Sequence, residues 1–164
     1  MEILRLDPET VALRQIDPFV AGLLRQIPSE TNPGDDENAR GRLFSKPAGE
    51  QVETLNEEWK FYVEPGLRHL FQSANETVSQ DLEGITKTKG NGEESYFLHI
   101  PVDHLEQWLN SLNQARLVMA AKNAFTEEEL AGEFPAIINS ARDINLLQIH
   151  FYASMQEIFI REIE

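Results

Sequence analysis

Four polar side chains in the last third of the chain have the types and spacing to form a site. They are Asn113, Arg116, Tyr152 and Gln156. Arg116 takes an apolar position in a helical stripe, one turn after Asn113. Such a guanidinium either covers apolar surface with its stem while its head reaches water or a carboxylate, or lines a pocket for an anionic ligand or a partner's carboxylate. Tyr152 and Gln156 lie one turn apart at the edge of an apolar helix face, which is typical of hydrogen-bonded groups at a helix interface, with Asn113 as a candidate partner.

The usual sequence patterns of metal and nucleophile chemistry are absent. A di-iron site in a helical protein requires Glu-x-x-His on two helices, but the residues three positions before the four histidines are Gly66, Tyr96, Pro101 and Leu147. No two histidines stand four apart, and there is no Gly-x-Ser-x-Gly turn, phosphate-binding loop or dinucleotide fingerprint. We therefore predict no metal, no cofactor and no catalytic residue, which favours a non-enzyme without settling the question.

Composition restricts the classes of partner. The chain has 164 residues, with 14 Lys and Arg against 28 Asp and Glu, so its formal net charge is −14. A protein this acidic repels phosphate backbones and anionic lipid, which argues against nucleic-acid and membrane partners despite a local basic cluster of Arg40, Arg42 and Lys46. The lack of cysteine excludes thiol chemistry. Without a basic, apolar leader after Met1 or a long apolar run, the sequence predicts a cytoplasmic protein.

The N-terminus is predicted to form a β-hairpin. Asp7-Pro8 suits a type I turn between the apolar segments 2–6 and 11–16. In the rival interpretation, Asp7 caps a helix whose first turn contains Pro8. We favour the hairpin, because the next Asp-Pro pair is the better helix start.

That helix is predicted over 17–27, where apolar residues follow the 3.6-residue period after Asp17-Pro18. Residues 28–49 are rich in Pro and Gly and are expected to be irregular, with one helical turn near 37–43.

The remainder is predicted to be mostly helical. The expected helices are 55–82, 103–124, a short helix after the Thr126–Glu129 capping box, and 141–164, and a strand is expected over 95–100. Pro65-Gly66 should kink or break the first of these helices. The strand can pair with the N-terminal hairpin into a minor sheet.

The last helix is apolar over more than half of its circumference. One face carries Ile144, Leu147, Phe151, Met155 and Ile158, while Ile149, Phe159, Ile160 and Ile163 lie outside that face. We expect this helix to be central to the fold or to lie in a dimer interface.

These elements predict a mainly α fold, in which three or four major helices form a bundle beside a small N-terminal β-hairpin and a minor sheet. Length and composition favour a single helical domain over residues 1–164, with 28–49 as its irregular segment.

Three segments in the C-terminal region carry distinct motifs. They are Trp108-Leu109-Asn110-Ser111-Leu112-Asn113-Gln114-Ala115-Arg116-Leu117-Val118-Met119, Thr126-Glu127-Glu128-Glu129 and Tyr152-Ala153-Ser154-Met155-Gln156-Glu157. Together they resemble the bacterial domain-of-unknown-function family twenty-seventeen, with Met155 where that family usually has Leu. The resemblance covers mainly residues 100–164, and the first hundred residues fit loosely. It implies a helical cytoplasmic protein with a regulatory role, and it assigns no catalytic residue.

The sequence therefore favours a non-enzymatic protein-interaction or regulatory module. Its partner is an unidentified protein or a second copy of the chain that binds through the C-terminal helix. The alternative is a small ligand-binding protein or enzyme with an anion-accepting pocket around Arg116.

Overall fold

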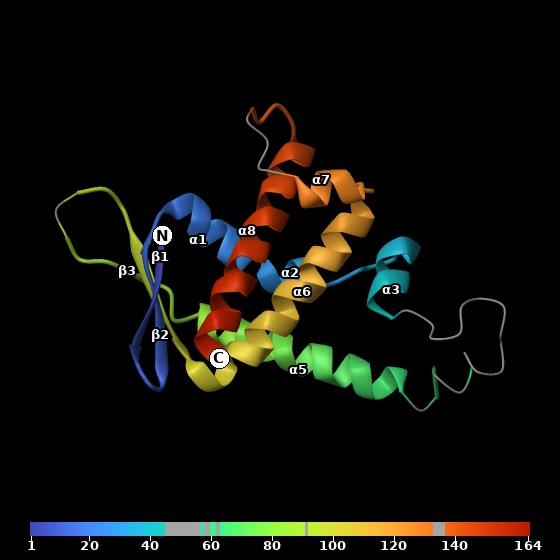
Figure 1. Cartoon of the computed structure of the whole chain (residues 1–164), viewed down its shortest axis with the longest axis horizontal. Coiled ribbons are helices and arrows are strands. Elements are labelled where there is room, and N and C mark those ends of the chain that lie inside the picture. The colour runs from blue at the N-terminus through green and yellow to red at the C-terminus, as the bar shows by residue number, and fades with distance from the viewer. Residues whose placement is uncertain (45–56, 58–59, 62, 91, 133–136) are drawn as a thin grey trace.

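The computed structural model describes residues 1–44, 57, 60–61, 63–90, 92–132 and 137–164. These residues form a mainly α-helical structure with a small antiparallel sheet at the N-terminal end, as predicted from the sequence (Figure 1). None of their helices combines the length and the apolar character needed to cross a lipid bilayer.

The N-terminal hairpin forms one side of a four-stranded sheet. Strands β1 (Glu2–Asp7) and β2 (Thr10–Ile16) are antiparallel, and the Asp7 carboxylate accepts a hydrogen bond from the backbone N–H of Glu9 (2.8 Å) in the turn between them. The predicted turn is thus confirmed, and the rival helix start at Asp7 is wrong. The predicted strand over 95–100 is β4 (Tyr96–Pro101), which pairs with β2 and with β3 (Thr86–Lys87), so that the strand order is β1-β2-β4-β3.

Short helices follow the hairpin. Helix α1 (Pro18–Arg25) begins where the sequence predicted, because the Asp17 carboxylate accepts a hydrogen bond from the N–H of Val20 (2.8 Å). Helices α2 (Ile27–Glu30) and α3 (Glu37–Leu43) lie in the segment expected to be mostly irregular. The single turn expected near 37–43 is α3, α2 was not anticipated, and residues 45–49 lie outside the described residues.

Three long helices make up most of the remaining described residues. They are α5 (Glu64–Leu82), α6 (Leu105–Lys122) and α8 (Ala141–Ile163). The short helix η1 (Val102–His104) leads into α6, and α7 (Glu127–Ala131) lies between α6 and α8. Pro65 stands in the first turn of α5, where no backbone N–H is required, so the break expected at Pro65-Gly66 is the start of this helix.

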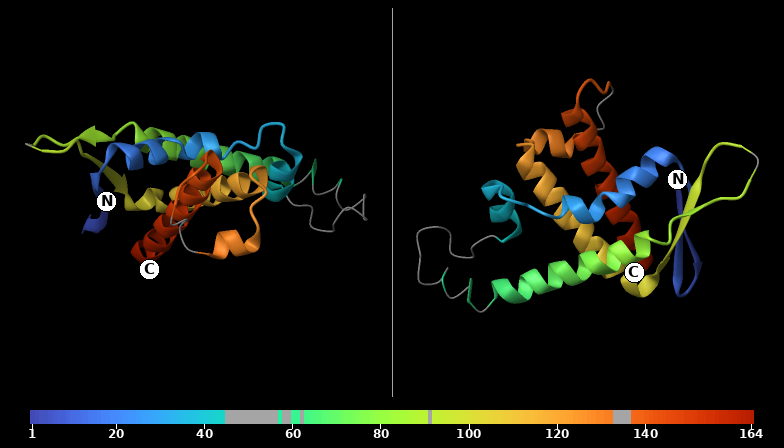
Figure 2. Two further views of the ribbon diagram at one scale, coloured as in Figure 1. Left: turned by 90° about the horizontal axis from the view of Figure 1, so that it is seen from above. Right: turned by 180° about the vertical axis from the view of Figure 1, so that it is seen from behind.

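Helix α6 is the central helix of this arrangement. Figure 2 (left) shows α6 between α5 on one side and α8 with α7 on the other, and α6 also packs against α2 and α3. Its fully buried Trp108 meets Phe159 of α8 edge-on, with ring centroids 6.0 Å apart. The core continues from these rings to the inner side of the sheet, where Leu13, Leu98 and other apolar side chains are buried.

The buried face of α8 differs from the predicted one. Ile144 is exposed, and Ile149 and Phe159, which were placed outside the main apolar face, are buried. The buried side chains are Leu146, Gln148, Ile149, Tyr152, Met155 and Phe159. The prediction was wrong because a helix that is apolar around most of its circumference offers several apolar faces, and its neighbours α6 and α1 decide which one is covered.

Candidate functional site

Arg116 lies at the contact between α6 and α8. Its Nη1 atom donates a hydrogen bond to Oε1 of Gln156 (2.5 Å), and Nε2 of Gln156 donates to the backbone carbonyl of Leu109 (3.3 Å). Two of the four predicted site residues therefore touch, although they lie 40 positions apart in the chain. The Nε atom of Arg116 is the one buried side-chain polar atom among the described residues that has no hydrogen-bond partner.

The charge of this guanidinium is incompletely satisfied. Burial lowers the pKa of Arg116, because desolvation disfavours the charged form, and the nearby Glu157 carboxylate acts in the opposite direction. The side chain nevertheless remains protonated at neutral pH, as arginine does in proteins. A buried donor without an acceptor costs about 1–3 kcal/mol. An acceptor from outside would be favourable only at the solvent-accessible part of this half-buried side chain.

Tyr152 lies one helical turn before Gln156 on α8 and makes a different contact. Its hydroxyl donates a hydrogen bond to the backbone carbonyl of Leu23 (2.6 Å) and accepts one from Nε2 of Gln148 (2.6 Å). Burial raises the pKa of this phenol, so the hydroxyl stays protonated. Tyr152 thus fastens α8 to α1 and belongs to the packing of the fold.

Asn113 is exposed on α6. Within the described part of the chain, no hydrogen bond joins it to Arg116, Tyr152 or Gln156. The structure therefore reduces the predicted four-residue cluster to the pair of Arg116 and Gln156.

A buried polar network between α2, α5 and α6 was missed by the sequence analysis. Asn75 is at its centre: its Oδ1 accepts from the Ser111 hydroxyl (2.6 Å), and its Nδ2 donates to Oγ1 of Thr31 (2.8 Å) and to Oε1 of Gln114 (3.4 Å). Nε2 of Gln114 in turn donates a hydrogen bond to Oδ1 of Asn110 (2.8 Å). The signal for this network in the sequence was the pair of polar residues Ser111 and Gln114, one helical turn apart on a helix whose other buried side chains are apolar.

A cavity of about 890 Å³ opens beside this network. Its walls come from α3, α5 and the residues after α2, and Asn75 and Gln114 reach it from the network. Arg40 of α3 and Arg68 of α5 contribute the positive charges of its lining, and Glu76 contributes a negative one. Of the basic cluster Arg40, Arg42 and Lys46, Arg40 therefore lines this cavity.

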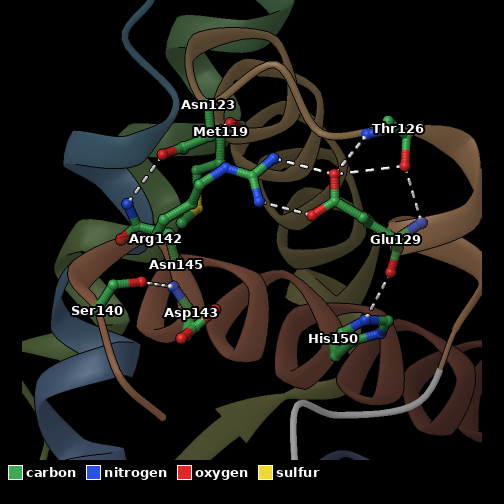
Figure 3. Close-up of polar contacts among 9 residues, drawn as sticks. All are labelled: Met119, Asn123, Thr126, Glu129, Ser140, Arg142, Asp143, Asn145 and His150. Carbon is green, nitrogen blue, oxygen red and sulfur yellow. Dashed lines mark hydrogen bonds and ion pairs between the residues drawn. The ribbon is translucent and has the colours of Figure 1, made fainter.

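The segment after α6 is held by a second polar cluster, which Figure 3 shows. Arg142 of α8 donates to both carboxylate oxygens of Glu129 (2.6 and 2.9 Å), and its guanidinium lies over the ring of Phe125, 4.4 Å from the centroid. Glu129 also completes the predicted capping box with Thr126, which is confirmed. Hydrogen bonds from Arg142 and Thr126 lower the pKa of Glu129 to about 2. These contacts are internal, and they fasten α7 to α8.

A third polar contact joins α5 to the start of α6. Oδ2 of Asp81 accepts a hydrogen bond from the indole N–H of Trp108 (2.9 Å) and lies 2.9 Å from Nδ1 of His104. Among the residues that the structure describes, no group of three or more His, Asp or Glu side chains is placed to hold a metal ion.

Comparison with known proteins adds one relationship. The family model described as "Domain of unknown function (DUF2017)" matches residues 3–163, so the match extends well beyond the C-terminal region that carries the motifs. No curated protein and no solved structure matches the chain. Two of the three motif segments of the sequence, 108–119 and 152–157, meet at the contact of Arg116 with Gln156.

Proposed function

The chain belongs to the DUF2017 family, and from that premise we propose that it is a non-enzymatic, cytoplasmic protein-interaction module with a regulatory role. Its interaction surface is the outer side of the α6–α8 pair, and the partner we propose is a second copy of the chain. The observation that carries this proposal is the half-buried, charged Arg116, whose guanidinium hydrogen-bonds the neutral amide of Gln156 at the contact between two helices.

Exposed apolar side chains continue this surface along α8. Ile160 and Ile163 follow Gln156 by one and two helical turns, so all three side chains point to the same side of the helix. Ile160 is 46% exposed and Ile163 is 43% exposed, so the two side chains present apolar surface to solvent on one helix face. A partner that covers them would remove apolar surface from water and could bring an acceptor to Arg116.

The position of α8 in the fold also supports the α6–α8 surface as the dimer interface. In our proposal the long helices α5, α6 and α8 act as the bundle predicted from the sequence, with α8 as its outer member (Figure 2). A two-fold axis beside α8 would place the same patch of each copy against the other, as most homodimers require. The burial must overcome the repulsion between two chains of net charge −14, so added salt should strengthen the dimer.

Size-exclusion chromatography with light scattering tests this proposal. We expect twice the chain mass of 18.7 kDa at micromolar concentration. Ile160→Glu should weaken the dimer by about tenfold or more, because it brings an unpaired charge into the interface. Ile137→Glu is the matched control, because Ile137 is a 70% exposed isoleucine that lies before α8. A strict monomer at these concentrations, or equal effects of the two variants, would refute the homodimer.

Arg116→Met separates the two roles that the sequence left open. If Arg116 only covers apolar surface, methionine should preserve self-association, because its stem is similar and its burial is less costly. If the guanidinium binds a carboxylate of the second copy, the same variant should weaken the dimer while the monomer keeps its stability or gains some.

The second candidate function is an anion-accepting ligand site at Arg116. The half-buried charge of Arg116 favours it, but Arg116 does not line the cavity of about 890 Å³ beside the Asn75 network. Acetate titration followed by NMR tests this alternative. Saturable shifts of the Arg116 signals that disappear in Arg116→Met would support it, and shifts at Arg116 that never saturate would exclude it.

A further inference from the structure

We propose that the cavity between α3 and α5 binds a small organic anion. Its carboxylate or phosphate group would lie between Arg40 and Arg68, and its neutral body would lie along the amide side chains of α5. This site is independent of the proposed dimer surface, because α5 and α8 lie on opposite sides of α6 (Figure 2).

Two of the three charged residues that line the cavity are arginines, one of them paired with Glu64, in a protein that is acidic as a whole. The charged lining residues are Arg40, Arg68 and Glu76, which give 2 − 1 = +1, whereas the whole chain carries −14. Positive charge that gathers in a hollow of an acidic protein focuses the local field there, since low-dielectric walls screen it less than open water does. An anion would therefore be attracted to this cavity and repelled by most of the remaining surface.

Arg68 is held in position before any ligand arrives. Its Nε and Nη2 atoms both donate to Oε1 of Glu64 (3.2 and 2.6 Å), and its guanidinium lies 4.1 Å from the centroid of the Phe44 ring. Neither hydrogen bond uses Nη1, so one edge of the planar group remains available. Because the stack and the ion pair already restrict the side chain, less conformational entropy is lost when an anion binds.

Arg40 approaches the same place from another helix. It lies on α3 one turn before Phe44, and it is exposed. Arg40, Phe44 and Arg68 line both the large cavity and an adjoining hollow of about 370 Å³, to which Lys60 and Glu64 also contribute. Arginines from two helices thus line the same hollow, and an oxyanion bound between their guanidinium groups would accept charge-assisted hydrogen bonds from both.

Apart from Glu76, the rest of the cavity is lined by uncharged residues. Asn75 and Gln114 belong to the buried network, where their side-chain amides already hydrogen-bond to protein groups. Gln72 and Gln80 extend the wall along α5, so that the distance from Arg68 to Gln80 is about 18 Å at 1.5 Å per residue. The cavity volume of about 890 Å³ is typical of sites for small ligands. These features fit a molecule with one anionic end and a neutral body that forms hydrogen bonds.

NMR titration of the full chain at constant ionic strength tests the site. Inorganic phosphate and succinate are the two probes, and the guanidinium signals of Arg40 and Arg68 are the readout. We expect saturable shifts at millimolar concentration with at least one probe, and the probe that binds more tightly identifies phosphate or carboxylate as the preferred group. Arg40→Gln should weaken that binding about tenfold, because it removes one set of charge-assisted hydrogen bonds.

Arg42→Gln is the matched control. Arg42 lies on the same helix and its substitution removes the same charge, but it does not line the cavity. The affinity of this variant for the probe should change by less than about twofold, since the lining of the cavity stays the same and the lost charge acts only at a distance. The proposal is overturned if neither probe shifts the Arg40 and Arg68 signals, if the shifts do not saturate, or if Arg42→Gln weakens binding as much as Arg40→Gln.

Discussion

Removing the Tyr152 hydroxyl tests how α8 is fastened to α1. Tyr152→Phe keeps the buried ring and its packing, and it deletes one oxygen that forms two hydrogen bonds of 2.6 Å, to the Leu23 carbonyl and from the Gln148 amide. We expect folding to persist with a lower free energy of unfolding, because the same residues fill the same space.

The size of the loss follows from these two contacts. A hydrogen bond inside a protein contributes about 0.5–1.5 kcal/mol net, and a buried group left without its partner costs about 1–3 kcal/mol. Nε2 of Gln148 also donates a hydrogen bond to Oε1 of Gln26 (3.1 Å), so the Gln148 amide keeps one acceptor in the variant. The backbone carbonyl of Leu23 loses its hydrogen-bond donor, the Tyr152 hydroxyl. Together these terms predict a decrease of about 2 kcal/mol in the free energy of unfolding.

Urea unfolding measures this decrease, and Tyr96→Phe is the matched control. The Tyr96 hydroxyl also forms a hydrogen bond, to Oε1 of Glu94, but this bond lies at the surface. The same chemical change should therefore have a much smaller effect there. If both variants lose the same stability, burial of the Tyr152 hydroxyl is not what makes its hydrogen bonds important.

The pH dependence gives an independent check. Burial raises the pKa of Tyr152 in the folded chain, whereas a tyrosine in the unfolded chain titrates near about 10. Its contribution to stability is fully present below about pH 10 and is lost as the pH rises above that value, because only the unfolded state then ionises. The stability difference between the natural chain and Tyr152→Phe should shrink above about pH 10. A difference that stays constant to pH 11 would refute the reasoning.

Three further substitutions test other parts of the fold. Ala124→Gly should raise the free energy of unfolding by up to about 1 kcal/mol in urea unfolding, because Ala124 has a φ of 51° that favours glycine, and a loss would contradict that conformation. Glu129→Gln should lower the melting temperature at pH 6 and less so at pH 3, because the folded pKa of about 2 means that the benefit of the charged Glu129 is lost as the pH falls toward that value; equal effects at both pH values would contradict this. Ser111→Ala should cost about 1–2 kcal/mol in urea unfolding, since it leaves Oδ1 of Asn75 without its donor, and a neutral result would show that the network is not formed.

Local signals in the sequence were sufficient for most element boundaries. The Asp7 turn, the Asp17 cap and the Thr126 capping box each depend on hydrogen bonds between residues two or three positions apart. Such contacts form in the same way whatever the rest of the chain does, so residue type and spacing predict them. The mainly α class and the small sheet followed from the periodicity between these signals.

The faces of the long helices could not be predicted in the same way. Ile144 and Ile149 are both isoleucines on a helix that is apolar almost all round, yet Ile144 is exposed and Ile149 is buried. Tyr152 was paired with Gln156 because they share one helix edge, but its partner Leu23 lies 129 positions away. These outcomes depend on which helices pack together, and one sequence without its tertiary contacts does not contain that information in a local pattern.

Two sets of polar residues on α6 illustrate how the structure separates packing from recognition. Ser111 and Gln114 are almost fully buried, and each forms a side-chain hydrogen bond with Asn75, so they specify how α5 and α6 meet. Arg116, only two positions after Gln114, is half-buried with one neutral partner and an Nε that has none. A buried polar group that is hydrogen-bonded within the chain is explained by folding, whereas a half-buried charge with a neutral partner is costly to the isolated chain. In the proposed dimer, a second molecule would bring an acceptor to the solvent-accessible part of the Arg116 side chain, and for this reason we propose recognition at the α6–α8 surface and packing as the role of the Asn75 network.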